Sequence, residues 1–83
     1  MDIYKYNEIW GYEYEQIREY LTDQGAASEG DTYELDSCTV VLDALPDRQI
    51  GELAFPQTRV RIKGSGADAF YHRFKLRFLK GGA

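Results

Sequence analysis

Apolar and polar side chains alternate through residues 70–79, close to the C-terminus of the chain. One parity holds Phe70, His72, Phe74, Leu76 and Phe78, and the other parity is mostly basic. Alternate side chains of a β-strand point to opposite faces. The pattern therefore favours a strand with one largely apolar face and one basic face.

A helix over residues 70–79 is the alternative. The residues that would share one arc at 3.6 residues per turn are Phe70, Tyr71, Phe74 and Phe78. Asp68 would be the N-cap and Gly81 the C-cap glycine. Against the helix, Leu76 and Leu79 would lie on its charged side, and aromatic residues suit pleated surfaces. We favour the strand, although a short apolar pattern is ambiguous by period alone.

A helical spacing precedes this region near the N-terminus. The apolar residues Trp10, Tyr14, Ile17 and Leu21 recur at intervals of three and four. Asn7 is a candidate N-cap, and Gly25 is a candidate stop at the C-terminus. Gly11 inside the helix would cost about 1 kcal/mol relative to alanine. A helix start after Gly11 therefore stays open.

Strand patterns fill the middle of the chain. Residues 32–42 read as one long strand with a bulge near Asp36 and Ser37, or as two strands. Residues 45–48 are expected to form a turn, and Pro56 restricts pairing to an edge or a bend. The loop at residues 64–68 would close a hairpin. The remaining expected strands are residues 49–55, 59–63 and 70–79. Ile50 and Leu53 are the apolar anchors of the first of these.

One helix followed by about four strands indicates the α+β class. We expect the N-terminal helix to pack on one face of a mostly antiparallel sheet, with a charged, wet second face. The 83 residues are expected to form a single domain, residues 1–83. So short a chain has a small core, which self-association would supplement.

Composition and cysteine content indicate a cytoplasmic protein. Hydrophobic residues make up 43% and charged residues 29% of the chain, which suits a folded domain. The single cysteine, Cys38, cannot form an intrachain disulfide, which fits a reducing compartment. The N-terminus lacks a signal-peptide pattern, and no apolar run approaches the roughly 18 residues of a membrane span. We expect no membrane contact.

Charge is divided unevenly along the sequence. Residues 1–55 hold thirteen acidic and three basic residues, whereas residues 56–83 hold one acidic and seven basic residues. A 59–63/70–79 hairpin would gather cations and a tyrosine on one face, a candidate anion or nucleic-acid face. Its residues are Arg59, Arg61, Lys63, Tyr71, Arg73, Lys75 and Arg77. We favour pairing of these cations with Glu34, Asp36, Asp43 or Glu52, because the domain is acidic overall.

No catalytic, metal or cofactor constellation emerges from the residue types. His72 is the only histidine, so a metal site with paired histidines is excluded. Cys38 would need a base nearby to act as a nucleophile, and we expect it to be buried. Residues 64–69 fit G-x-G-x-x-A, but they do not open a βαβ unit. We expect no enzyme activity and no cofactor.

Aromatic residues cluster toward the N-terminus, where Tyr4 and Tyr6 precede Trp10. The candidate protein interface consists of Trp10, Tyr12, Tyr14 and Tyr20. The alternative is that these rings lie half-buried over the sheet with their hydroxyls in water. The sequence therefore predicts a binding module, either a homodimer or an accessory subunit. The alternative function is a nucleic-acid-binding module that uses the basic face of the hairpin.

Overall fold

The computed structural model describes residues 3–81, and the side chains of residues 3–78. It is an α+β fold with two helices and one five-stranded sheet, where the sequence predicted one helix and about four strands. Every pair of neighbouring strands is antiparallel, in the order β1-β5-β4-β3-β2. The elements are β1 (Tyr6–Trp10), α1 (Tyr14–Asp23), β2 (Ala27–Glu29), β3 (Thr32–Leu35), β4 (Cys38–Ile50), β5 (Leu53–Lys63) and α2 (Ala67–Gly81).

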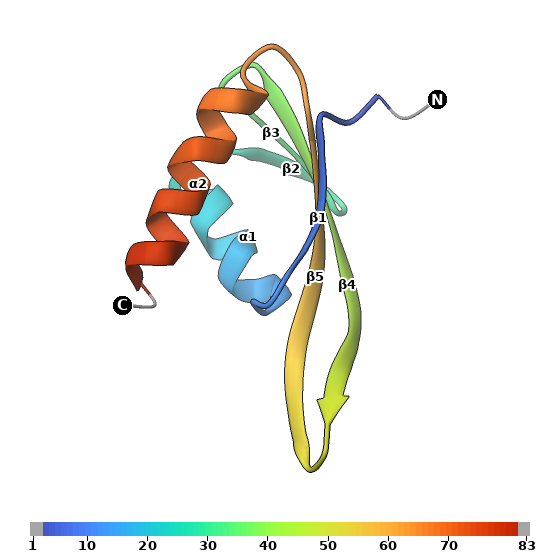
Figure 1. The fold of residues 1–83 in the computed structure, drawn as a ribbon. Helices are drawn as coiled ribbons and strands as arrows, with labels where there is room; N and C mark the ends of the chain where they lie inside the picture. The colour runs from blue at the N-terminus through green and yellow to red at the C-terminus, as the bar shows by residue number, and fades with distance from the viewer. Residues whose placement is uncertain (1–2, 82–83) are drawn as a thin grey trace.

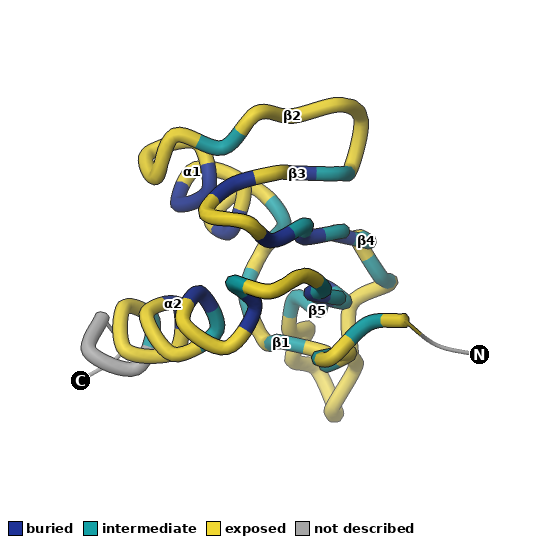
Figure 2. Tube along the Cα trace, turned by 90° about the horizontal axis from the view of Figure 1, so that it is seen from above, coloured by how far each residue is buried: buried dark blue, intermediate teal, exposed yellow. Residues whose placement is uncertain are grey.

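Both helices lie on the same side of the sheet, and no described element covers its other face (Figure 1). Buried residues lie on both helices and on β3, β4 and β5 (Figure 2). Val40, Leu42, Val60 and Ile62 supply the sheet layer of the core, and each is at most 1% exposed. Alternation in β4 and β5 thus places one apolar row against the helices and leaves the opposite row at the surface.

The predicted strand at residues 70–79 is wrong, because this segment belongs to helix α2. Phe70 and Phe74, one helical turn apart, are fully buried, whereas Leu76 is 51% exposed. A strand would have put Phe74 and Leu76 on the same face. The 59–63/70–79 hairpin therefore does not exist. Asp68 lies in the first turn of α2 and is not its N-cap, and Gly81 is the last helical residue.

The start of the first helix also differs from the main prediction. Trp10 ends β1 and Asn7 lies inside that strand, so Asn7 is not an N-cap. Helix α1 begins after Gly11, which was the open alternative. Its N-cap is Glu13, whose backbone N–H donates to the side-chain oxygen of Gln16 at 3.0 Å, as in a capping box. The predicted stop is confirmed, because Gly25 follows the helix with a φ of 86°.

Of the two interpretations of residues 32–42, the two strands are confirmed, and Asp36 and Ser37 form a two-residue hairpin turn between β3 and β4 in place of a bulge. Both residues have positive φ angles, 47° and 60°, as a type I′ turn requires. Helix α2 begins beside this turn, and its approach requires Gly66. A Cβ atom on Gly66 would lie 2.0 Å from the backbone oxygen of Asp36. The glycines of residues 64–69 therefore serve close packing.

The turn predicted at residues 45–48 is wrong, because β4 continues through it to Ile50. The register between β4 and β5 shifts between Leu45 and Arg48, and this irregularity accommodates Pro46. The actual turn is Gly51 and Glu52, where Gly51 has a φ of 61°. It divides the strand predicted at residues 49–55, because glycine adopts positive φ without strain.

Candidate protein-binding surface

Strands β4 and β5 project beyond their neighbours as a two-stranded ribbon (Figure 1). β1 pairs with β5 only over residues 58–62, and β3 pairs with β4 only over residues 38–41. We call residues 45–57 the arm, because no third strand accompanies them on either edge. No arm residue is buried. The arm is therefore a surface element that contributes little to the core.

Large apolar side chains are exposed on the arm. Ile50 is 52%, Leu53 62% and Phe55 43% exposed, and Ile9 at the end of β1 is 53% exposed. Ile50 lies opposite Leu53 in the strand register. By strand alternation these arm residues belong to the face that carries Arg59, the partner of Ile9. We call Ile9, Ile50, Leu53 and Phe55 the arm patch.

The arm patch borders a hollow of about 280 Å³ where β1 ends and β5 continues paired only with β4. Its lining residues are Ile9, Gly11, Arg48, Ile50, Phe55, Pro56 and Gln57. Small-molecule sites usually occupy about 300–1,000 Å³. The hollow is therefore at the small end for a cofactor, and its apolar walls suit one large side chain.

The predicted basic face is divided between two sides of the molecule. Arg59, Arg61 and Lys63 lie on the sheet face opposite the helices, by the alternation of β5. Arg61 donates to Asp43 at 2.9 Å, and its guanidinium lies 5.1 Å from the centre of the Tyr4 ring. The ring of Tyr4 also lies 5.3 Å from Nζ of Lys63. Among the described residues, Arg59 forms no ion pair.

The other predicted cations belong to α2 and have local contacts. Arg73 pairs with Asp36, and this ion pair raises the pKa of the guanidinium. Nζ of Lys75 lies 5.2 Å from the centre of the Tyr71 ring. The guanidinium of Arg77 lies 5.9 Å from the centre of the Tyr20 ring. Two of the four acidic partners expected from the sequence, Asp36 and Asp43, do pair with basic residues of the predicted face.

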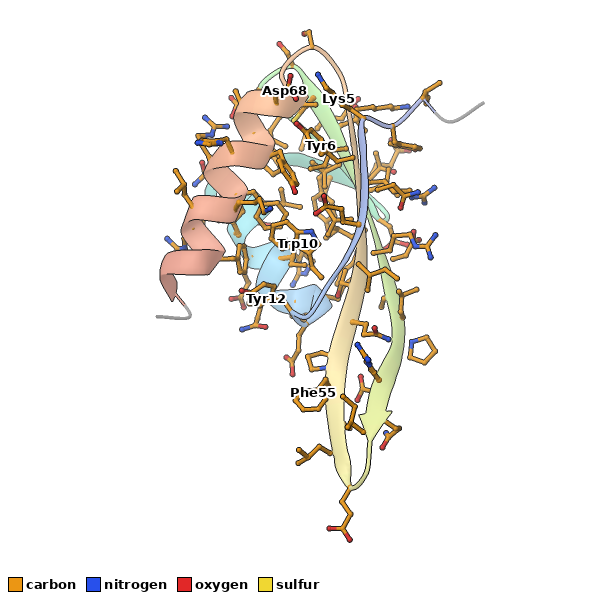
Figure 3. The ribbon with its side chains drawn as sticks, in the orientation of Figure 1. Lys5, Tyr6, Trp10, Tyr12, Phe55 and Asp68 are labelled. Carbon is orange, nitrogen blue, oxygen red and sulfur yellow. The ribbon has the colours of Figure 1, made fainter. Side chains whose placement is uncertain are left out.

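The predicted aromatic interface packs largely against α2. Trp10 stacks on Phe74 with ring centroids 4.2 Å apart, and Tyr20 stacks on the same ring at 5.4 Å. Tyr20 is only 8% exposed. Tyr12 lies 4.7 Å from the ring of Phe78. In Figure 3, Trp10 and Tyr12 lie between the sheet and the helices, whereas Phe55 lies apart on the arm. A binding role for these aromatic residues stays a prediction.

Tyr14, the fourth residue of that set, contacts the β2–β3 turn. Its hydroxyl donates to Asp31 at 2.6 Å. Burial, followed by this hydrogen bond, raises the pKa of Tyr14 far above its ordinary value of 10.0. This contact fixes α1 to the far edge of the sheet.

A second polar cluster joins the N-terminal segment to α2 (Figure 3). Lys5 Nζ donates to Asp68 at 2.6 Å, and the Tyr6 hydroxyl donates to the other oxygen of Asp68. The Tyr6 ring stacks on Tyr71 at 3.9 Å. The bond to Asp68 raises the pKa of Tyr6 to about 12, while Lys5 and Tyr6 lower the pKa of Asp68. No sequence pattern links positions so far apart in the chain.

The groups with chemical potential are dispersed. His72 is exposed on α2, and Cys38 is 5% exposed in the core, as expected for a free cysteine. Burial raises the pKa of the Cys38 thiol, which lowers its reactivity. Within residues 3–81, no group of three or more His, Cys, Asp or Glu side chains is arranged to hold a metal ion. Neither described helix is long and apolar enough to cross a membrane.

The function of this surface has to be inferred from its geometry. No protein-family model matches the chain, and no curated protein is significantly similar to it.

Proposed function

We propose that this protein is a non-enzymatic binding module that docks onto another protein through the arm patch. The observation that carries the proposal is the exposure of Ile9, Ile50 and Phe55 around one hollow, with Leu53 exposed opposite Ile50 on the same arm. Together these side chains present roughly 400 Å² of surface, a size at which apolar patches often mark interaction sites. Burying that area would contribute about 10 kcal/mol before the costs of association, at about 25 cal/mol per Å².

The position of the patch supports a binding role over a structural one. Ile50 and Leu53 flank the turn of the arm, far from the buried residues of the sheet. Polar residues at these positions would satisfy the same turn and strand geometry without exposing apolar surface to water. Large aliphatic residues there gain free energy only when something covers them.

A comparative pull-down tests the proposal. The wild-type protein, a Leu53→Ser/Phe55→Ser double variant and a Leu76→Ser control are immobilised and exposed to extract from the producing cells. Leu76 is a matched control because it is an exposed apolar residue on α2. We expect a discrete protein to be retained by the wild type and the control and lost from the double variant. Equal retention by all three proteins would contradict the proposal.

A second candidate function is single-strand nucleic-acid binding. It rests on the row of Arg59, Arg61 and Lys63 along β5, with Tyr4 beside two of these cations. Basic rows with aromatic side chains hold single strands by phosphate neutralisation and stacking. Fluorescence anisotropy with a labelled RNA of about 12 nucleotides tests this function. Nucleic-acid binding of this kind should weaken steeply as the salt concentration rises. The Arg59→Glu substitution should also weaken it, whereas the control substitution Arg77→Glu on α2 should leave it unchanged.

A further inference from the structure

We infer that the arm patch recognises an acidic polypeptide segment of another protein, anchored by one bulky apolar side chain. This inference rests on the proposed function and specifies its partner. Three features of the described residues carry it: the blocked edges of the arm, the apolar hollow, and the two unpaired cations beside that hollow.

Both free edges of the arm carry a proline. Pro46 lies on β4 beyond the end of β3, and Pro56 lies on β5 beyond the end of β1. Proline has no backbone N–H to donate to an added strand. Edge prolines and irregular pairing are devices that prevent strand-to-strand association. A partner is therefore recognised by the side chains of the arm, and not by strand addition along its edges.

The hollow beside β1 suits an apolar anchor. Ile9, Ile50 and Phe55 form its apolar walls. Gln57 is held at its side, because its amide nitrogen donates to the backbone oxygen of Pro46 at 3.1 Å. The register shift next to Pro46 is thereby fixed by a hydrogen bond across the arm. A Leu, Phe or Trp side chain entering this hollow would remove the exposed apolar atoms from water.

Positive charge without an internal partner borders the same hollow. Arg48 lines it, and Arg59 lies opposite Ile9 in the strand register. Neither arginine forms an ion pair with a described residue, and the nearby carboxylate of Asp43 is already paired with Arg61. Guanidinium groups recognise carboxylates through paired hydrogen bonds. The anchor is therefore expected to be flanked by Asp or Glu.

The same charges argue against a second copy of this chain as the occupant. A two-fold contact uses the same patch on both molecules. It would bring Arg48 and Arg59 of each copy into one interface, where like charges repel. A nucleic acid fits the hollow less well, because Ile9, Ile50 and Leu53 are aliphatic and Phe55 is the one side chain of the arm patch with a planar surface for base stacking.

Selection from a random peptide library on the immobilised full-length protein tests this inference. We expect enriched peptides to combine one Leu, Phe or Trp with at least two nearby acidic residues. A chosen peptide is then titrated by fluorescence anisotropy. Phe55→Ser and Arg48→Glu should each weaken binding at least tenfold, and replacing the peptide carboxylates by amides should do the same. The α2 controls Leu76→Ser and Arg77→Glu should bind as the wild type does.

Enrichment of basic or uncharged peptides, or of none, would overturn the inference, as would equal binding by Arg48→Glu. The pull-down of the proposed function is scored independently of these peptides. Light scattering detects a further outcome, in which the wild-type protein forms a dimer and the Leu53→Ser variant is a monomer. That dimer would overturn the acidic segment and leave the arm patch as a protein-binding surface. Circular dichroism verifies that each variant is folded. Arg59→Glu, at a partly exposed position of β5, is a second test of whether positive charge contributes to peptide binding.

Discussion

Replacing Phe74 by alanine tests the placement of α2, on which the whole architecture depends. Phe74 is fully buried, stacked on Trp10 and Tyr20, and in ring contact with Phe70 and Phe78. Truncating a buried phenylalanine costs about 3–5 kcal/mol, and the loss of stacked partners places this site toward the upper end. A domain of this length has a total stability of about 4–12 kcal/mol. The variant should therefore lose a third or more of its free energy of unfolding.

Leu76→Ala is the matched control on the same helix. Leu76 is 51% exposed, so its truncation should change the free energy of unfolding by no more than about 0.5 kcal/mol. Urea denaturation followed by the fluorescence of Trp10 measures both variants, since Trp10 is the only tryptophan and stacks on Phe74. A strand at residues 70–79 would bury both positions alike. Equal destabilisation by the two substitutions would therefore refute the helix.

Three further predictions follow from single contacts. Gly66→Ala should destabilise the protein by about 1–3 kcal/mol, because the added Cβ would meet a backbone oxygen at 2.0 Å. Gly11→Ala is the control, because a Cβ atom on Gly11 would have no atom within 4 Å. This control should be nearly neutral in the same urea assay. Tyr6 should ionise near pH 12, measured as the absorbance difference at 295 nm between the wild type and Tyr6→Phe. Asp68→Asn should return the pKa of Tyr6 toward 10.0. An unchanged pKa in that variant would contradict the hydrogen bond between Tyr6 and Asp68. The raised pKa favours the folded state below pH 10, and this contribution is lost as the pH rises through about 12. Cys38 should react with a thiol reagent slowly in the native protein and rapidly in denaturant, and a fast native reaction would disprove its burial.

Period-two alternation was sufficient to predict part of the sheet. Strand β3 and the start of β4 match their predicted ranges, and Val60 and Ile62 of β5 are buried as the pattern indicated. These segments succeeded because one face is covered by helices and the other is exposed, which imposes strict alternation. The arm lies beyond that cover, so its apolar residues follow no core pattern, and the turn at Gly51 falls inside the strand predicted at residues 49–55.

Residues 70–79 fit both periods, and tertiary packing decided between them. The side chains of Phe70 and Phe74 are buried in the core with α1 and the sheet, and a helix places both there while it leaves Leu76 exposed. Gly66 allows the helix to begin against the β3–β4 turn. Neither fact can be read from the local pattern. The predicted basic face failed for the same reason, since its two halves belong to a strand and a helix.

The exposed arm patch was missed because Ile50 and Leu53 were interpreted as the apolar anchors of a strand at residues 49–55. Their exposure depends on where β1 and β3 end, which is a property of the assembled sheet. Proline at positions 46 and 56 was the available signal, because proline in a strand indicates an unpaired edge. Pro56 was interpreted in this way, and it does lie on an edge beyond β1.

Site-specific photo-crosslinking in the producing cells tests the central claim most directly. A benzophenone amino acid replaces Leu53 in one variant and Leu76 in another, since both positions are exposed and lie on different elements. We predict that the residue at position 53 forms an adduct with a discrete protein, and that Arg48→Glu in the same chain abolishes this adduct. The residue at position 76 should form no such adduct. Adducts that form equally from both positions, or only with nucleic acid at position 53, would contradict a protein-binding role for the arm.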